Sequence, residues 1–282
     1  MANFGRLRYR ASNSLVRIPL IWLRHRGLDS SDVFLASYPR SGNTWLRFLL
    51  VEILSGGSVE FDNVNRFIPE MGIHGKTPAL LPGGGRLIKT HEPYRREYKR
   101  AIYLYRDVRG VLLSNYSRVK QLGLEDIDLD AYISRSLQGQ KGGIGTWQKH
   151  IVSWLDSPLA SRGDLLLVRF EDMRKDTEQA LASIVNFLGV TADRSSIQRA
   201  IANNTVARMR EKENRSRNLP KITQEQGRFV REGAVSGWQS RLTEKQLQLV
   251  DQYAGQVLQR LGYPLEGVPV VDPDAAQVAN VS

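Results

Sequence analysis

Four short apolar runs stand out along the chain, and each predicts a buried β-strand. They cover residues 33–36, 87–90, 102–105 and 165–168, and none alternates regularly between apolar and polar positions. Strands that are buried on both faces, separated by segments with helical spacing, are typical of a parallel sheet with helices on each side. The pattern therefore predicts a single-domain α/β fold with a central parallel sheet flanked by helices.

The segments between and after the predicted strands show the spacing of helices. Apolar residues recur at intervals of three or four over residues 45–53, 108–119, 176–188 and 243–261, which predicts four helices. Gly189 and Gly262 end the last two, as glycine commonly does after a helix. Residues 211–237 are instead polar and charged and contain Pro220 and three glycines, so we expect a long surface loop there.

The chain shows no internal repeat and no linker rich in Gly, Ser or Pro, so we expect one domain over residues 31–268. We expect a basic lead-in over residues 1–30 and a flexible tail over residues 269–282. The first 26 residues carry six Arg and no acid, and their apolar run is too short to span a bilayer. Pro19 interrupts that run, which argues against a signal peptide. We therefore expect a cytoplasmic protein.

Charge and cysteine content narrow the functional classes. The chain carries 40 Lys and Arg against 29 Asp and Glu, a formal net charge of +11. This excess predicts an anionic partner, which is nucleic acid, a membrane surface or a multiply phosphorylated small molecule. The absence of cysteine excludes disulfides, thiolate catalysis and Cys-ligated zinc. Because the chain has only four His, we expect no metal site.

The loop between the first strand and its helix has the composition of an anion site. It places small residues, a cation and hydroxyls at a helix N-terminus, where backbone N–H groups and the helix dipole favour a phosphate. It is not a Walker A loop, G-x-x-x-x-G-K-[ST], because that motif needs a longer glycine-bounded turn. The candidate ligands in this loop are Arg40, Ser41, Gly42, Asn43, Thr44 and Trp45.

A second strand-to-helix loop carries another pair of candidate phosphate ligands. Arg106 follows the third strand, and Ser114 lies eight residues later in the predicted helix. A guanidinium and a hydroxyl placed in this way can bind the same phosphate, because Arg donates two parallel hydrogen bonds and Ser114 reaches the anion from the side.

Both loops resemble nucleotide motifs of the sulfotransferase family. The string YPRSGNTW at residues 38–45 resembles the 5′-phosphosulfate loop, usually written YPKSGTTW. Residues 105–114 resemble the 3′-phosphate motif, with Val108 and Gly110 where family members usually have Pro and Asp. Three shorter blocks, at residues 87–93, 145–150 and 170–173, also follow the family order.

A late segment completes the resemblance. Residues 229–238 are similar to the family segment R-K-G-x-x-G-D-W-K, in which Arg231, Gly233 and Trp238 match and Glu232 replaces a Lys. The resemblance implies that Arg231, Glu232 and Gly233 also bind the cofactor, with the reversed charge of Glu232 as a departure.

The resemblance implies a P-loop-kinase-like sulfotransferase fold. It implies transfer of a sulfuryl group from 3′-phosphoadenosine 5′-phosphosulfate (PAPS) to a hydroxyl or amine of a small-molecule acceptor, without a metal, leaving adenosine 3′,5′-bisphosphate (PAP). Arg40 would lie near the bridging oxygen, Lys89 near the sulfuryl oxygens, and His91 would take the proton of the acceptor. Glu92 is the alternative base. Trp45 either stacks on adenine or packs in the core.

Two other functions stay open. A P-loop kinase or NTPase would use the acids after the fourth strand, but the Walker A Lys and Ser/Thr pair is missing. A module that binds an anionic surface would explain the net charge of +11. No nucleic-acid motif occurs, whereas weak peripheral contact with anionic lipid is compatible with the basic lead-in. The expected acceptor walls, residues 63–85 and 123–145, indicate no particular acceptor, and the oligomeric state stays open.

Overall fold

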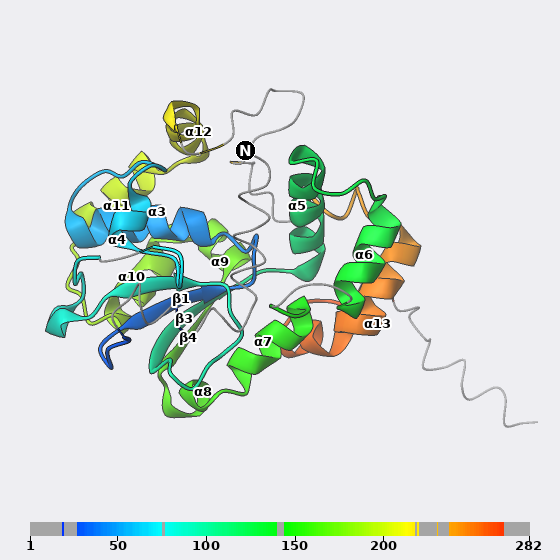
Figure 1. The fold of residues 1–282 in the computed structure, drawn as a ribbon, viewed down its shortest axis with the longest axis horizontal. Helices are drawn as coiled ribbons and strands as arrows, with labels where there is room; N and C mark the ends of the chain where they lie inside the picture. Colours follow the sequence, from blue (N-terminus) through cyan, green and yellow to red (C-terminus); the bar gives the residue numbers. More distant parts are fainter. Residues whose placement is uncertain are drawn as a thin grey trace, which may run out of the picture.

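The four predicted strands form one parallel sheet. The computed structural model describes residues 19, 27–74, 77–139, 144–217, 219, 230 and 237–267. The sheet has the order β2-β1-β3-β4 and consists of β1 (Val33–Ser37), β2 (Leu87–Thr90), β3 (Arg100–Tyr105) and β4 (Leu165–Arg169) (Figure 1). Since every strand runs in the same direction, the loops after their carboxyl ends meet at one edge of the sheet.

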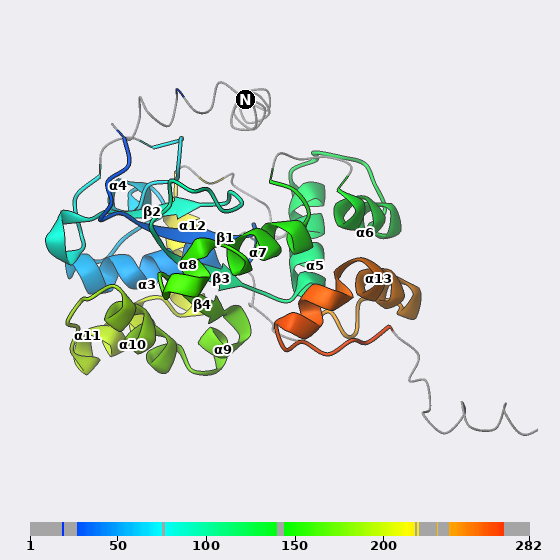
Figure 2. The same ribbon diagram turned by 90° about the horizontal axis from the view of Figure 1, so that it is seen from below.

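Alternate residues of the strands enter two separate hydrophobic cores. Val33 and Leu35 of β1 belong to one core, and Phe34 and Ala36 belong to the other. The first core is closed chiefly by α3 (Asn43–Ser55), α9 (Phe170–Lys175), α10 (Thr177–Phe187) and α11 (Arg194–Asn203). The second is closed by α5 (Val108–Gln121), α6 (Leu129–Gln138), α7 (Trp147–Leu155), α8 (Pro158–Arg162) and α13 (Glu244–Arg260). Figures 1 and 2 show the sheet between these two groups, which confirms the predicted α/β architecture.

Local capping interactions start α10 and α13, and the glycine predicted to end α13 is confirmed. The side chain of Asp176 accepts a hydrogen bond from the Gln179 amide at the start of α10, and Thr243 and Gln246 form a reciprocal capping box at the start of α13. Gly262 follows α13 with φ of 73°, the left-handed conformation expected of a residue that ends a helix.

Helices occur in one expected acceptor wall, residues 123–145, which we expect from the sequence to be a loop, and in the expected surface loop over residues 211–237. α6 lies inside residues 123–145, where Asp128 caps it and Tyr132, Ile133 and Leu137 face the core. α12 (Val206–Arg215) extends into the polar stretch that begins at residue 211. This hydrophilic helix is stable because Met209 packs into the first core, and because the ammonium of Lys212 pairs with a buried carboxylate. The shorter elements are α4 (Val64–Phe67) and the 3-10 turn η1 (Pro82–Gly84).

Several predictions from the sequence lie outside the described residues. These are the expected tail over residues 269–282, nearly all of the basic lead-in, and the cofactor ligands Arg231, Glu232 and Gly233. Among the residues that the structure does describe, no helix combines the length and apolarity that crossing a bilayer requires.

Candidate active site

The loop between β1 and α3 has a backbone shape that only glycine allows at its last position. Gly42 is the N-cap of α3 with φ of 96°, and a Cβ built there would come within 2.5 Å of the Phe170 ring. Arg40 is also left-handed, with φ of 72°, a conformation that non-glycine residues seldom adopt outside turns and functional sites. No side chain caps α3, and its first turn holds no acid. The amides and the dipole of this helix end therefore favour an anion.

The two predicted phosphate loops come together at this point. Arg40 donates a hydrogen bond from Nε to the Ser114 hydroxyl at 3.0 Å, and Arg106 donates from Nη1 to the Arg40 carbonyl at 3.3 Å. The Arg106 guanidinium also lies 4.6 Å from the centre of the Phe170 ring. Arg106 and Ser114 thus face the same place although they belong to a strand end and to the second turn of α5, as their spacing predicts.

A cavity of about 280 Å³ opens beside these side chains. Nine of the predicted residues line it: Arg40, Gly42, Asn43, Thr44, Trp45, Lys89, His91, Arg106 and Ser114. The Ser41 side chain does not line the cavity, because it is fully buried. Its hydroxyl has no hydrogen-bond partner in the described part of the chain. The structure thus gathers into one cavity most of the predicted site residues from three separate segments.

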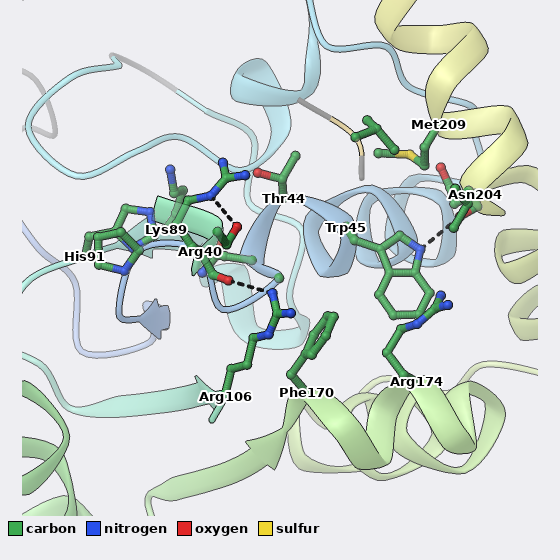
Figure 3. A pocket seen from close by; sticks show the side chains of 16 residues that line it. Arg40, Thr44, Trp45, Lys89, His91, Arg106, Phe170, Arg174, Asn204 and Met209 are labelled. Atoms are coloured by element: carbon green, nitrogen blue, oxygen red, sulfur yellow. Dashed lines mark hydrogen bonds between the residues drawn. The ribbon is translucent and has the colours of Figure 1, made fainter. Parts of the chain in front are cut away.

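The other end of the cavity is built by Trp45 together with residues that the motifs did not identify. Trp45 donates from Nε1 to the Asn204 carbonyl at 2.9 Å, and the Arg174 guanidinium lies 5.2 Å from the centre of the indole. Figure 3 shows Lys89, His91 and Arg40 at one end and Trp45, Arg174 and Met209 at the other. Trp45 both packs against the core and lines the cavity, so the two alternatives for this residue are compatible.

A buried polar network fixes this second end relative to α3. Glu52 of α3 accepts hydrogen bonds from Asn203 at 3.0 Å and from the ammonium of Lys212 at 3.2 Å, and Lys212 also donates to the Asn204 side chain at 2.8 Å. Together with the bond from Trp45 to Asn204, these contacts attach the corner between α11 and α12 to the helix that begins at the anion loop. They are distant in sequence and follow no motif, which is why sequence reasoning missed them.

His91 has the tautomer that a general base requires. Its Nδ1 lies 2.7 Å from the Ser37 carbonyl, and a carbonyl only accepts, so Nδ1 carries the proton and Nε2 is left with its lone pair. Burial, followed by the nearby Lys89 ammonium, lowers the pKa of His91 to about 3. The ring is therefore neutral at physiological pH. The contact with the Ser37 carbonyl also orients the ring.

Glu92, the alternative base, faces elsewhere. Its side chain is buried, and its carboxylate accepts a hydrogen bond from the Tyr98 hydroxyl and pairs with Arg95 at 3.2 Å. It does not line the cavity. His150 has a structural role, because its ring bonds to the Tyr103 hydroxyl at 2.8 Å and to the His91 carbonyl at 3.2 Å.

Lys89 meets its counter-ion at the rim of the same site. Its Nζ lies 3.1 Å from a carboxylate oxygen of Glu70. Burial raises the pKa of Glu70, but Lys89, His91 and Arg47 outweigh that effect and lower it to about 2. Glu70 is therefore ionised throughout the working pH range.

The lining of the cavity is strongly cationic. It includes Arg40, Lys89, Arg106 and Arg174 and, among the described residues, no acid. No cluster of His, Asp or Glu in the described ranges is arranged to hold a metal ion. Glu171, which a Walker B arrangement would aim at a metal, instead accepts a hydrogen bond from the Tyr263 hydroxyl at 2.8 Å. The site fits a compact polyanion joined to a planar group.

Comparisons with known proteins agree with this chemistry. A family model described as a sulfotransferase domain matches residues 30–262. Sulfotransferase 2A2 of Rattus norvegicus is 25% identical over 268 residues, which cover 84% of this chain and 90% of the relative. Sulfotransferase 2A1 of Macaca fascicularis is 27% identical over 248 residues, which cover 79% and 83%.

Solved structures share the fold. Mouse sulfotransferase SULT7A1 complexed with PAP matches with a TM-score of 0.64 and 21% identity, covering 88% of this chain and 91% of that one. Retinol dehydratase in a complex with retinol and PAP matches with a TM-score of 0.68 and 18% identity, covering 93% and 88%.

Proposed function

This chain belongs to the sulfotransferase domain family, and from that premise we propose that its cationic cavity binds PAPS and passes the sulfuryl group to a small acceptor beside His91. The observation that carries the proposal is the convergence of the two phosphate loops with Lys89 and His91 on one cavity without acids in its described lining. The kinase alternative finds no comparable support there.

One end of the cavity suits the phosphate groups of this nucleotide, and the other end suits its adenine. The start of α3 would bind the 5′-phosphosulfate, and Arg106 with Ser114 would bind the 3′-phosphate, because guanidinium and hydroxyl groups both donate to phosphate oxygens. The adenine would lie against Trp45 and Met209 at the opposite end. The solved relatives named above were each in complex with PAP, which is PAPS without its sulfuryl group.

The residues at the first end would then perform the transfer. The acceptor oxygen attacks sulfur, the bond from sulfur to the bridging oxygen breaks, and PAP departs with that oxygen. His91 takes the acceptor proton on Nε2, which its tautomer leaves vacant. Lys89 neutralises the sulfuryl oxygens, and Arg40 stabilises the leaving phosphate as a fixed positive charge that cannot give up a proton.

The acceptor is proposed to be a small molecule with a hydroxyl or amine. Retinol, which is bound in the retinol dehydratase complex named above, is a small apolar molecule with a hydroxyl. The acceptor would approach from the His91 side of the cavity, near which the segment around Glu70 lies against β2. A cytoplasmic location and the domain limits 31–268 stay predictions from the sequence.

Calorimetry with PAP tests this proposal directly. We expect PAP to bind without added metal and at least about tenfold more tightly than AMP, because a hydrogen bond to a charged group contributes roughly 1.5 to 3 kcal/mol. The same titration with Mg²⁺ and with EDTA should give the same affinity. Equal binding of AMP and PAP, or a requirement for Mg²⁺, would contradict the proposal and favour the kinase alternative.

A further inference from the structure

Glu70 and Lys89 are held side by side by their backbones. Residue 70 forms a parallel bridge with residue 89 on the outer edge of β2. The Lys89 amide donates to the Pro69 carbonyl at 2.8 Å, and the Met71 amide donates to the Lys89 carbonyl at 2.8 Å. Because these two bonds fix the register, both side chains leave the backbone at neighbouring points, and the carboxylate and the ammonium meet at 3.1 Å.

This ion pair is largely shielded from water. The Lys89 side chain is 10% exposed and the Glu70 side chain 27% exposed, so their attraction is screened less than that of a surface pair. An ammonium has three donors. One donor is directed to Glu70. Because Lys89 also lines the cavity, its positive charge acts both on Glu70 and on a ligand in the cavity.

The remaining charges around Lys89 are positive or neutral. Arg47 of α3 is buried, donates from Nη2 to the Asn65 side chain at 2.6 Å, and acts on both Lys89 and Glu70. His91, at the end of β2, is neutral, as is His150 behind it. On the Glu70 side, His74 accepts a hydrogen bond on Nδ1 from the Glu70 amide at 3.2 Å. Within the described part of the chain, Glu70 is therefore the carboxylate that offsets the burial of Lys89.

We propose that Glu70 is a positioning residue for sulfuryl transfer, which keeps the Lys89 ammonium charged and fixed at the cavity so that it can meet the sulfuryl oxygens. The inference rests on the function proposed above and adds to it a residue that does not touch the nucleotide. Burial lowers the pKa of Lys89, and Glu70 opposes that effect. Without the carboxylate, burial and Arg47 would act unopposed, and Lys89 would lose its proton at a lower pH.

The test compares the affinities of PAPS and PAP as the pH is raised, and it needs no acceptor. The ratio of the two affinities reports contacts to the sulfuryl group, and in the native protein it should fall when Lys89 deprotonates. In Glu70→Gln the fall should move about 1 to 3 pH units lower, the usual effect of an opposite charge at this distance. Glu97→Gln, which removes an exposed carboxylate, is the matched control and should leave the curve unchanged.

A double variant separates charge from shape. In Glu70→Gln with Lys89→Arg, the guanidinium stays charged, so the alkaline fall in the affinity ratio should disappear. Circular dichroism and thermal unfolding check that each variant is folded. If native protein binds PAPS and the Glu70→Gln curve coincides with the native one, Glu70 has only a structural role and the inference is wrong. If native protein does not bind PAPS, the proposed function itself fails.

Discussion

Replacing His91 tests the chemistry most directly, because the structure separates its two roles. Its Nδ1–H orients the ring on the Ser37 carbonyl, and its Nε2 would take the acceptor proton. His91→Ala should lower turnover by ~10²- to 10⁴-fold, the range for a lost general base, which corresponds to about 3 to 5 kcal/mol of transition-state stabilisation. PAP affinity should change little, because the proposed phosphate ligands Arg106 and Ser114 stay in place.

His91→Asn is the matched control for this substitution. The asparagine amide can still donate to the Ser37 carbonyl but cannot accept a proton from the acceptor. Equal losses of turnover in the Ala and Asn variants would show that the base matters, whereas an active Asn variant would show that the hydrogen bond alone matters and would refute the assignment. Turnover is followed as PAP release, with the best hydroxyl acceptor from a screen of small alcohols and phenols.

The pH profile gives a second measurement on the same residue. From the sequence we would expect the base to lose its proton near the ordinary value of about 6.5. Because burial and Lys89 lower the pKa of His91 to about 3, kcat/KM for PAPS, which reports the free enzyme, should stay flat from neutral pH down to about pH 5. A fall centred near 6.5 that is absent in His91→Asn would refute the low value.

Three further predictions follow from the geometry of the site. Arg106→Ala should weaken PAP binding by roughly 1.5 to 3 kcal/mol in calorimetry with little change in thermal stability, and unchanged affinity would remove Arg106 from the site. Gly42→Ala should cost about 1 to 2 kcal/mol in stability for its left-handed backbone and should also weaken PAP binding, because the new methyl displaces Phe170; Ala at native affinity and stability would contradict the loop geometry. Burial lowers the pKa of His150 to about 4, so the unfolded chain binds a proton that the native protein excludes. His150 should therefore contribute a loss of stability of up to about 1.4 kcal/mol per pH unit as the pH drops from about 6.5 to about 4, and urea denaturation should show a correspondingly shallower slope in His150→Gln; an unaltered slope would contradict this.

The parts of the site that the sequence predicts are those that follow strands. In a parallel sheet the carboxyl ends of all strands lie at one edge, so Arg40, Lys89 and Arg106, each at or just beyond the end of an apolar run, had to come close together. The same argument does not fix which way a side chain points. Ser41 and Glu92 belong to the same blocks, yet both side chains are buried away from the cavity.

The parts that could not be predicted depend on contacts between distant segments. Residues 206–215 form a helix although they show no apolar periodicity. The helix is stabilised instead by the ion pair between Lys212 and Glu52 of α3, which the sequence does not reveal. Glu70 lies in a segment without strand character, and only the backbone pairing with Lys89 reveals its proximity. The low pKa of His91 likewise results from burial, which residue types and spacing do not specify.

Helix α3 has a consequence for which nucleotides can fit. Its first residues border the anion loop, while Trp45 and Glu52 along its length hold the corner that carries Asn204. The separation between the two ends of the cavity is therefore fixed by one helix, with a rise of about 1.5 Å per residue. In the binding mode proposed above, this separation would have to match the span from base to terminal anion, and a nucleotide with a longer phosphate chain would have to give up one end. Discrimination by length would then be a property of the core beneath the cavity rather than of any single group that touches the nucleotide.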